Sequence, residues 1–259
     1  MLGFSRSKAY YRSQKATSDL ITYEQLLGVL QSNPSYGHRR LALALGLGKK
    51  RVRRVMKLFG LKPYKRQARW RKRRDEQRAP MPYPNLVKGL CPRVANYVWV
   101  CDFTYLDFQD RFLYLATVVD LFTREVLGWH VSTRHTKDLV IEALQDALIT
   151  RCLVRPRIIH SDQGVEYASK DYIQFATNWG IEISMSKKAS PWENPYQESY
   201  FNNFKTDLGL EFSRFDTVGE FIEAIHQTIN YYNKHRIHTS LKMSPSNFYQ
   251  QQIRIEKLS

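Results

Sequence analysis

Three strand-like segments follow one another closely in the middle of the chain, and they limit what it can fold into. They span residues 98–106, 112–120 and 126–132 and are rich in β-branched and aromatic residues. Only a few residues separate each segment from the next, whereas a parallel connection needs about a dozen or more. The chain therefore contains a sheet that begins as an antiparallel meander.

Helical and strand-like segments alternate after this meander. An amphipathic helix is expected over residues 136–151 and a short buried strand at 158–160. The later elements are a helix at 170–179, a strand at 181–184, and helices at 195–210 and 217–234. This order predicts an α/β domain over residues 96–250, in which helices flank a mixed sheet.

Nearly all of the net charge of +16 lies ahead of the sheet. Residues 36–78 carry 17 Lys and Arg against two acidic residues. The later part of this segment lacks apolar periodicity and ends in three prolines, so we expect a basic linker over residues 63–95. Such a concentration of cations favours a nucleic-acid partner, with a solvated basic arm as the alternative.

Three short helices are expected before this linker, at residues 22–30, 38–45 and 49–59. Their expected buried residues are Leu26, Leu27 and Leu30, then Leu41 and Leu45 with Ala44 as an additional candidate, then Val52, Val55, Met56 and Phe59. A glycine-containing turn before a basic amphipathic helix is typical of a helix-turn-helix. We therefore expect a small helical DNA-binding region over residues 1–62, although a three-helix cap with a solvated basic face would show the same pattern.

The cations of this region are the candidate DNA-binding residues, because Lys and Arg neutralise phosphates. Those on the third helix and at the start of the linker are Lys49, Lys50, Arg51, Arg53, Arg54, Lys57, Lys65 and Arg66.

Three acidic residues occupy unusual positions in the α/β domain. Asp102 lies in the middle of the first strand, Asp162 follows the buried strand at 158–160, and Glu198 lies one turn into a helix. A buried carboxylate is costly unless a cation compensates it. Each acid alone could be a satisfied buried group, a turn residue or an acid favoured at a helix N-terminus. Together they indicate a site for hard divalent cations, which support phosphodiester chemistry when two lie about 4 Å apart.

Several ordered motifs resemble one known family. They are Trp-Val-Cys-Asp-Phe-Thr-Tyr at 99–105, His-Ser-Asp-Gln-Gly at 160–164, Ser-Met-Ser-Lys-Lys at 184–188 and Trp-Glu-Asn-Pro-Tyr-Gln-Glu at 192–198, followed by segments 231–238 and 244–245. The interval between Asp162 and Glu198 is 35 residues. With these motifs the chain resembles the integrase catalytic core of bacterial insertion-sequence transposases, the DDE class related to retroviral integrases. Segments 3–7, 10–12 and 36–40 resemble the second reading frame of insertion sequence family three.

This resemblance implies an RNase H-like fold and a polynucleotidyl transferase. It implies two Mg²⁺ ions, or Mn²⁺ in their place, held by the catalytic residues Asp102, Asp162 and Glu198. The implied reaction is cleavage at the ends of the element followed by attack of a 3′-hydroxyl on target DNA. The implied partners are double-stranded DNA, namely the terminal repeats of the element and the target, and further copies of the chain on that DNA. An upstream-frame protein is a further possible partner.

Two more basic residues are DNA-binding candidates on the strength of this resemblance. Lys205 lies seven residues after Glu198, on the same helix face, where related integrases have a Lys that touches the DNA end. Arg236 is a weaker candidate, as are His160, Asn233 and His238, because structural hydrogen bonding explains these residues equally well. One departure is Glu-Asn-Pro at 193–195, where the family often has Asp-Asn-Ala.

Composition excludes several other classes of protein. No apolar run approaches the ~20 residues of a membrane span, and the N-terminal segment has no apolar signal-peptide core. Cys91, Cys101 and Cys152 are widely spaced, which fits a reduced cytoplasmic setting. The resemblance implies a bacterial protein that lies on the nucleoid when DNA is bound. Two other functions are compatible with the pattern: a catalytically silent or domesticated sequence-specific DNA-binding protein, and an RNase H-like nuclease acting on hybrids or junctions.

Overall fold

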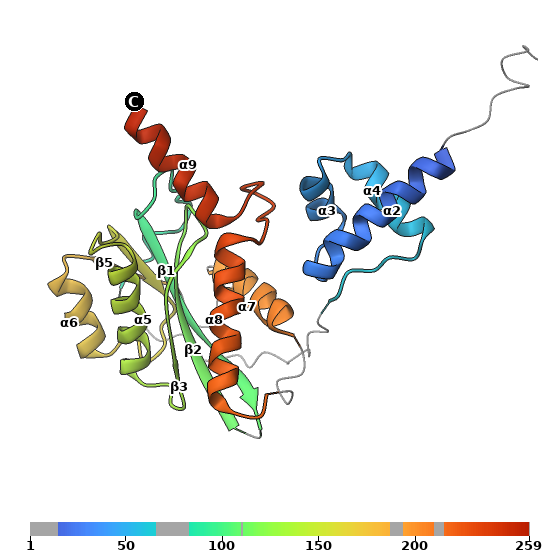
Figure 1. The fold of residues 1–259 in the computed structure, drawn as a ribbon. Coiled ribbons are helices and arrows are strands. Elements are labelled where there is room, and N and C mark those ends of the chain that lie inside the picture. The colour runs from blue at the N-terminus through green and yellow to red at the C-terminus, as the bar shows by residue number, and fades with distance from the viewer. Residues whose placement is uncertain (1–14, 66–82, 110, 187–193, 210–214, 259) are drawn as a thin grey trace, which may run out of the picture. The chain divides into compact units, whose positions relative to one another are not determined.

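The structure is a computed structural model that describes residues 15–65, 83–109, 111–186, 194–209 and 215–258. The chain divides after Lys65 into two compact units (Figure 1). The predicted domain limits at residues 62, 95 and 250 stay predictions, since much of the expected linker lies outside the described ranges.

The first unit contains helices α2 (Lys15–Ser32), α3 (His38–Leu45) and α4 (Lys49–Leu58). The bounds of α3 and α4 agree with the prediction to within one residue. Gly46 adopts a left-handed conformation with φ of 63° and ends α3, which allows the tight turn into α4. The small core of this unit contains Leu26, Leu41, Val52 and Val55, all fully buried.

Helix α2 differs from its prediction in length and in the face that it buries. It begins at Lys15, seven residues before its predicted start. The prediction missed this first half because its buried residues, Asp19 and Thr22, are polar and give no apolar periodicity. Arg54 on α4 forms an ion pair with Asp19, which compensates the buried charge. Leu27, predicted to be buried, is exposed.

The inward faces of α2 and α3 also need a correction beyond Leu27. Leu30 and Leu45 are only half-buried, and Ala44 is exposed. Ala42 takes the buried position on α3 instead. The prediction for α4 was better: Val52, Val55 and Met56 are buried, and Phe59 stacks on Tyr23 of α2 with ring centroids 4.4 Å apart.

The second unit is built on a five-stranded mixed sheet. Its strands are β1 (Val98–Phe108), β2 (Arg111–Asp120), β3 (Val126–Ser132), β4 (Ile158–Ser161) and β5 (Glu182–Met185), in the order β3-β2-β1-β4-β5. The first three strands pair antiparallel, and β4 and β5 extend the sheet in parallel beyond β1. The predicted meander and mixed α/β sheet are confirmed.

Helices cover both faces of this sheet (Figure 1). Helices α5 (Lys137–Thr150) and α6 (Lys170–Asn178) lie on one face, and α7 (Pro195–Leu208) and α8 (Val218–Lys234) on the other. Alternation along β1 separates the two cores: Val98 and Val100 face α7 and α8, whereas Trp99 and Cys101 face α5 and α6. These four helices match the predictions to within two residues, but α9 (Pro245–Leu258) was not predicted.

Strand β3 packs very closely against α5. A Cβ atom on Gly128 would lie 2.3 Å from both the Ala143 carbonyl oxygen and the Ala147 backbone nitrogen. Glycine is therefore the residue that permits this close approach of helix to strand.

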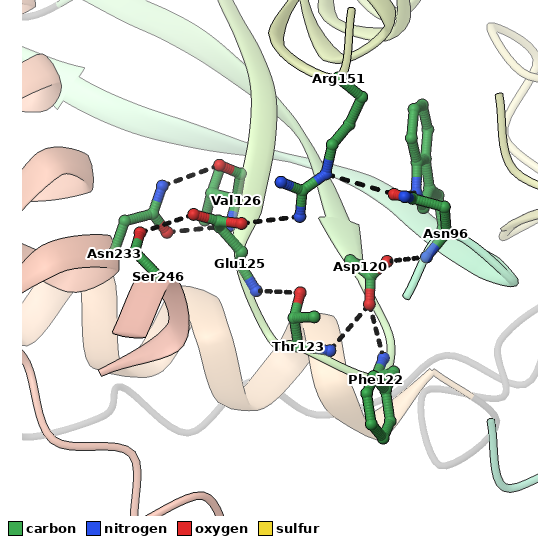
Figure 2. A network of polar contacts seen from close by, with 10 residues as sticks. Asn96, Asp120, Phe122, Thr123, Glu125, Val126, Arg151, Asn233 and Ser246 are labelled. Atoms are coloured by element: carbon green, nitrogen blue, oxygen red, sulfur yellow. Dashed lines mark hydrogen bonds and ion pairs between the residues drawn. The ribbon is translucent and has the colours of Figure 1, made fainter. Parts of the chain in front are cut away.

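A polar network joins α8 and α9 to the β2–β3 turn (Figure 2). Arg151, at the end of α5, donates to the Glu125 carboxylate at 2.7 Å, and Ser246 of α9 donates to the other Glu125 oxygen at 2.6 Å. The Asn233 side chain of α8 bonds both the N–H and the C=O of Val126. These hydrogen bonds connect α8 and α9 to the turn between β2 and β3.

Across the described ranges, no helix combines the length and the apolar character that a membrane crossing requires.

Candidate active site

Asp102 and Asp162 come together because their strands are neighbours. The parallel register pairs Val98 with Ile158 and Val100 with His160. Continued by two residues, the same register sets Asp102 opposite Asp162, just past the end of β4. The electrostatics agree, because the charge of Asp162 raises the pKa of Asp102. Two of the three predicted acids therefore share one location.

The surroundings of these two carboxyl groups disfavour their ionised forms. Burial raises the pKa of Asp102 to about 8, and the Asp162 charge adds to the rise, whereas the Phe103 N–H and Lys205 oppose it. Partial desolvation likewise raises the pKa of Asp162, with a hydrogen bond from the Gly164 N–H opposing it and the charge of Glu166 adding to it. Negative charge at this point of the sheet lacks full compensation.

Helix α7 lies along the stretch of β1 that contains Asp102. Gln197 is fully buried and donates to the Val100 carbonyl at 2.6 Å, and Lys205 donates to the Tyr105 carbonyl at 2.9 Å. Glu198 follows Gln197 directly and is exposed. Glu198 therefore lies on the part of α7 that passes Asp102. Its position one turn into the helix agrees with the prediction.

Lys205 is close enough to Asp102 to act on its ionisation. Its charge lowers the pKa of Asp102, and its Nζ lies 4.9 Å from the centroid of the Tyr105 ring. The structure therefore brings Lys205 into the neighbourhood of the acids, while its contact with DNA stays a prediction.

The side chains at this site suit a hard divalent cation in their chemistry. Asp102 and Asp162 supply carboxylate oxygens, the donors that Mg²⁺ prefers, and a bound cation would compensate their charge. Among the residues that the structure describes, no three His, Cys, Asp or Glu side chains are grouped closely enough to hold a metal ion. The participation of Glu198 therefore stays a prediction.

Two further residues near Asp162 were not predicted from the sequence. Glu166 is buried, with its side chain only 5% exposed, and its Oε1 lies 2.7 Å from Nδ1 of His135. Residues 163–169 contain no helix or strand, and His135 precedes α5, so neither periodicity nor a known spacing singles them out.

The structure divides the basic residues of α4 into two groups. Lys49, Lys50, Arg53 and Lys57 are exposed. Arg51 donates to Ser18 and Thr22, and Arg54 pairs with Asp19, so these two side chains fasten α4 to α2. Lys65 is exposed, and Arg66 lies outside the described residues.

The weaker DNA-binding candidates have structural partners. Arg236 is buried and bonds Asp207 and Asn203, which favours a structural role, because a side chain so enclosed would have to break this ion pair to reach a phosphate. Its contact with DNA stays a prediction. His160 is buried, with Nδ1 2.8 Å from the Ser184 hydroxyl. The Asn233 side chain accepts a hydrogen bond from the Val126 N–H, and the backbone N–H of His238 donates to the Met243 carbonyl.

The stability of the metal-free protein is expected to fall as pH rises from about 4 to about 8. In this window the folded state keeps the Asp102 proton, whereas an unfolded Asp, with a pKa near 3.9, has lost it, so each rise in pH favours unfolding. Asp102→Asn is expected to reduce this dependence and to raise the Tm at pH 8 in EDTA by roughly 3–6 °C. Thermal denaturation at pH 5 and pH 8 measures this, with Asp107→Asn on the exposed part of β1 as control. An unchanged pH slope in Asp102→Asn would contradict the expectation.

Solved structures share the fold of the second unit. The catalytic core domain of the HTLV-2 integrase, solved in complex with magnesium, superposes with a TM-score of 0.51 at 18% identity, covering 61% of this chain and 98% of that one. A chain of the simian T-cell lymphotropic virus intasome, solved in complex with the PP2A regulatory subunit B56 gamma, gives a TM-score of 0.54 at 19% identity, covering 85% of this chain and 73% of that one. These likenesses confirm the predicted RNase H-like fold.

Sequence comparisons identify relatives along most of the chain. Two models described as integrase core domain match residues 92–191 and 179–245. The transposase of insertion sequence element IS904 of Lactococcus lactis is 33% identical over 77% of this chain and 79% of its own length. An uncharacterized 31 kDa protein of insertion element IS600 of Shigella sonnei is 31% identical over 96% of both chains. On these matches, the chain belongs to the insertion-sequence transposases that carry an integrase core domain.

Proposed function

We propose that this transposase uses divalent cations to cleave DNA at the ends of its element and to join the resulting 3′-hydroxyl to target DNA. The observation that carries the proposal is the meeting of Asp102 and Asp162 on adjacent strands, where their charge is incompletely compensated. The HTLV-2 integrase core was solved with magnesium, which supports Mg²⁺ as the cation. We further propose two ions, with Mn²⁺ as a substitute.

Asp102, Asp162 and Glu198 would hold these ions. Bound divalent ions would activate the attacking oxygen and stabilise the leaving oxygen at phosphorus. The chain's own contribution is to fix the acids: β1 and β4 set the two aspartates side by side, and the buried Gln197 fastens α7 beside them. Lys205, a cation close to Asp102, would attract a DNA phosphate to this place.

A strand-joining assay tests the proposal. The full-length protein, duplexes carrying the terminal repeats of the element, and a supercoiled target are mixed with Mg²⁺, with Mn²⁺ or with EDTA. Joined products that require a divalent ion and a terminal-repeat sequence are expected. Absence of cleavage with every end sequence, together with metal-independent DNA binding, would instead support the alternative of a silent or domesticated DNA-binding protein. Greater activity on RNA–DNA hybrids than on duplex ends would support an RNase H-like nuclease.

We also propose that α4 binds DNA through its exposed cations. Lys50, Arg53 and Lys57 recur at helical spacing and share one face of α4, opposite the buried Val52, Val55 and Met56. Lys49 lies beside them at the helix N-terminus. Arg51 and Arg54 contribute less in this proposal, since α2 already occupies their side chains.

Replacing Lys50 and Arg53 together by Gln is expected to weaken DNA binding similarly on all sequences and to reduce the salt slope by about two. Each lost phosphate contact lowers the number of released counterions by about one, and the slope of log K against log[salt] falls by the same amount. Fluorescence anisotropy between low and moderate salt measures the slope. Arg254→Gln, an exposed cation of α9, serves as the control. A slope equal to that of the unmodified protein would exclude α4 from the phosphate contacts.

The remaining partners follow from the reaction class. Joining two ends of an element requires both ends to be held at once, so we propose a homo-oligomer on DNA. The intasome assembly among the similar structures supports this. A protein from an upstream reading frame is a further candidate partner, and we place the active protein on the bacterial nucleoid. Sedimentation of the chain with and without paired ends would measure its assembly state.

A further inference from the structure

We propose that His135 and Glu166 are positioning residues that hold the Asp162 carboxylate beside Asp102, so that the two acids together bind a divalent cation. This inference rests on the proposed function, since it concerns the same site. It adds two residues that neither the sequence motifs nor the comparisons identify.

Glu166 and Asp162 both lie beside Gly164. A Cβ atom on Gly164 would lie 3.0 Å from Oδ1 of Asp162 and also 3.0 Å from Oε2 of Glu166, so both carboxylates approach the same point. The Gly164 N–H donates to that same Asp162 oxygen at 2.9 Å. The placement of the Asp162 carboxylate therefore depends on the segment 162–166, and Glu166 is the buried residue of that segment closest to it.

His135 fastens the other end of Glu166. Its Nδ1 donates to Oε1 of Glu166 at 2.7 Å, while the other Glu166 oxygen, Oε2, lies beside Gly164. The Glu166 side chain is 5% exposed, whereas that of His135 is 53% exposed. A buried carboxylate held by one charge-assisted hydrogen bond has little freedom to move.

The ring of His135 also touches the strand that carries Asp102. It stacks on Phe103, the next residue along β1, with centroids 6.2 Å apart and an interplanar angle of 9°, and it lies 4.8 Å from the ring of Tyr114 on β2. His135 thus packs against β1 beside one acid and, through Glu166, supports the loop that holds the other. One side chain connects the two metal-binding segments.

Such a connection is needed because the acids repel one another. Oδ1 of Asp162 and Oε2 of Glu166 each lie 3.0 Å from one point beside Gly164, and the parallel register sets Asp102 opposite Asp162, so like charges gather at one place when no cation is bound. Glu166 is not itself grouped with two further acids, His or Cys as a metal site anywhere in the described ranges. Its contact with His135 fits a supporting role, and partners of this kind orient the groups that bind a metal.

The decisive experiment measures metal affinity without DNA. Mg²⁺ and Mn²⁺ binding to the full-length protein is followed by titration calorimetry for the unmodified chain and for His135→Ala, His135→Phe, Glu166→Ala and Glu166→Gln. Loss of the connection is expected to weaken binding about 10-fold or more in His135→Ala and Glu166→Ala. Glu166→Gln keeps an oxygen that accepts the His135 hydrogen bond and is expected to stay within about threefold of the unmodified protein. His135→Phe keeps the stacking but loses the hydrogen bond, so it is expected to behave like His135→Ala.

A matched control comes from a second histidine in the same unit. His226 stacks on Trp129 and lies 3.9 Å from Glu223, but both of these side chains are well exposed and belong to α8. His226→Ala is expected to leave metal affinity unchanged. In strand joining, the His135 and Glu166 alanine variants are expected to need about 10-fold more Mg²⁺ for half-maximal rate and to recover most of the rate at saturating Mg²⁺.

Three outcomes would overturn the inference: affinities within twofold of the unmodified protein, an equal loss in Glu166→Gln and Glu166→Ala, or an equal loss in His226→Ala. The second outcome would mean that the charge of Glu166 acts rather than its position. Failure of the proposed function looks different, because then the unmodified protein itself would neither bind the cation nor join DNA.

Discussion

Alanine at Asp102, Asp162 or Glu198 is expected to lower strand joining at least about 10³-fold, equivalent to roughly 4 kcal/mol of transition-state stabilisation. The physical reason is that each removes a carboxylate from a site whose cation-binding power depends on charge collected at one place. Asp102 and Asp162 already interact electrostatically, so loss of either leaves the other as an isolated acid. DNA affinity measured in the same buffer is expected to stay within about twofold, because α4 carries the proposed phosphate contacts.

The same substitution at a neighbouring acid provides the control. Asp107 lies on β1 and is exposed, so Asp107→Ala changes the charge of the chain equally but leaves the site intact. Glu198→Ala is the most informative of the three, since Glu198 is joined to the other acids only through the course of α7 along β1. Full activity in Glu198→Ala would remove Glu198 from the site, and full activity in Asp102→Ala or Asp162→Ala would refute the proposed chemistry.

Periodicity predicted the second unit well because its elements have one apolar face each. The strands of the meander and the helix over α5 show this pattern plainly, and their bounds agree to within two residues. Helix α2 shows where this approach fails. Its first half buries Asp19 and Thr22, and the distant Arg51 and Arg54 contribute to making that burial favourable. No local pattern contains this information.

The site was predictable only in part for the same reason. Motif spacing identified Asp102, Asp162 and Glu198 through the resemblance, but the neighbourhood of the two aspartates depends on β4 pairing with β1 rather than with a strand closer in sequence. Glu166 and His135 lie 31 residues apart and meet only in the folded chain. A buried carboxylate beside an exposed histidine cannot be read from either local sequence.

Arg236 offers the largest expected effect on stability. Arg236→Met is expected to lower the free energy of unfolding of the second unit by about 3–5 kcal/mol, because it leaves the buried Asp207 carboxylate without its cation. Asp207→Asn is also expected to destabilise this unit, because it leaves the buried Arg236 guanidinium without its carboxylate partner. The double variant Arg236→Met with Asp207→Asn is expected to lose less than the two single changes combined, because neither charge is then left buried alone. Chemical denaturation followed by circular dichroism measures all three.

This prediction also separates the two interpretations of Arg236. Lys234 lies two residues earlier and is exposed, so Lys234→Met removes a cation from the same region without breaking a buried pair and is expected to leave stability unchanged. If Arg236 were a DNA contact, Arg236→Met would weaken DNA binding and reduce the salt slope at constant stability. A buried ion pair requires the reverse: stability falls, and the DNA affinity of the protein that remains folded is preserved. Because Asp207 and Asn203 belong to α7, the helix that carries Glu198 and Lys205, loss of this pair is further expected to reduce strand joining through displacement of that helix.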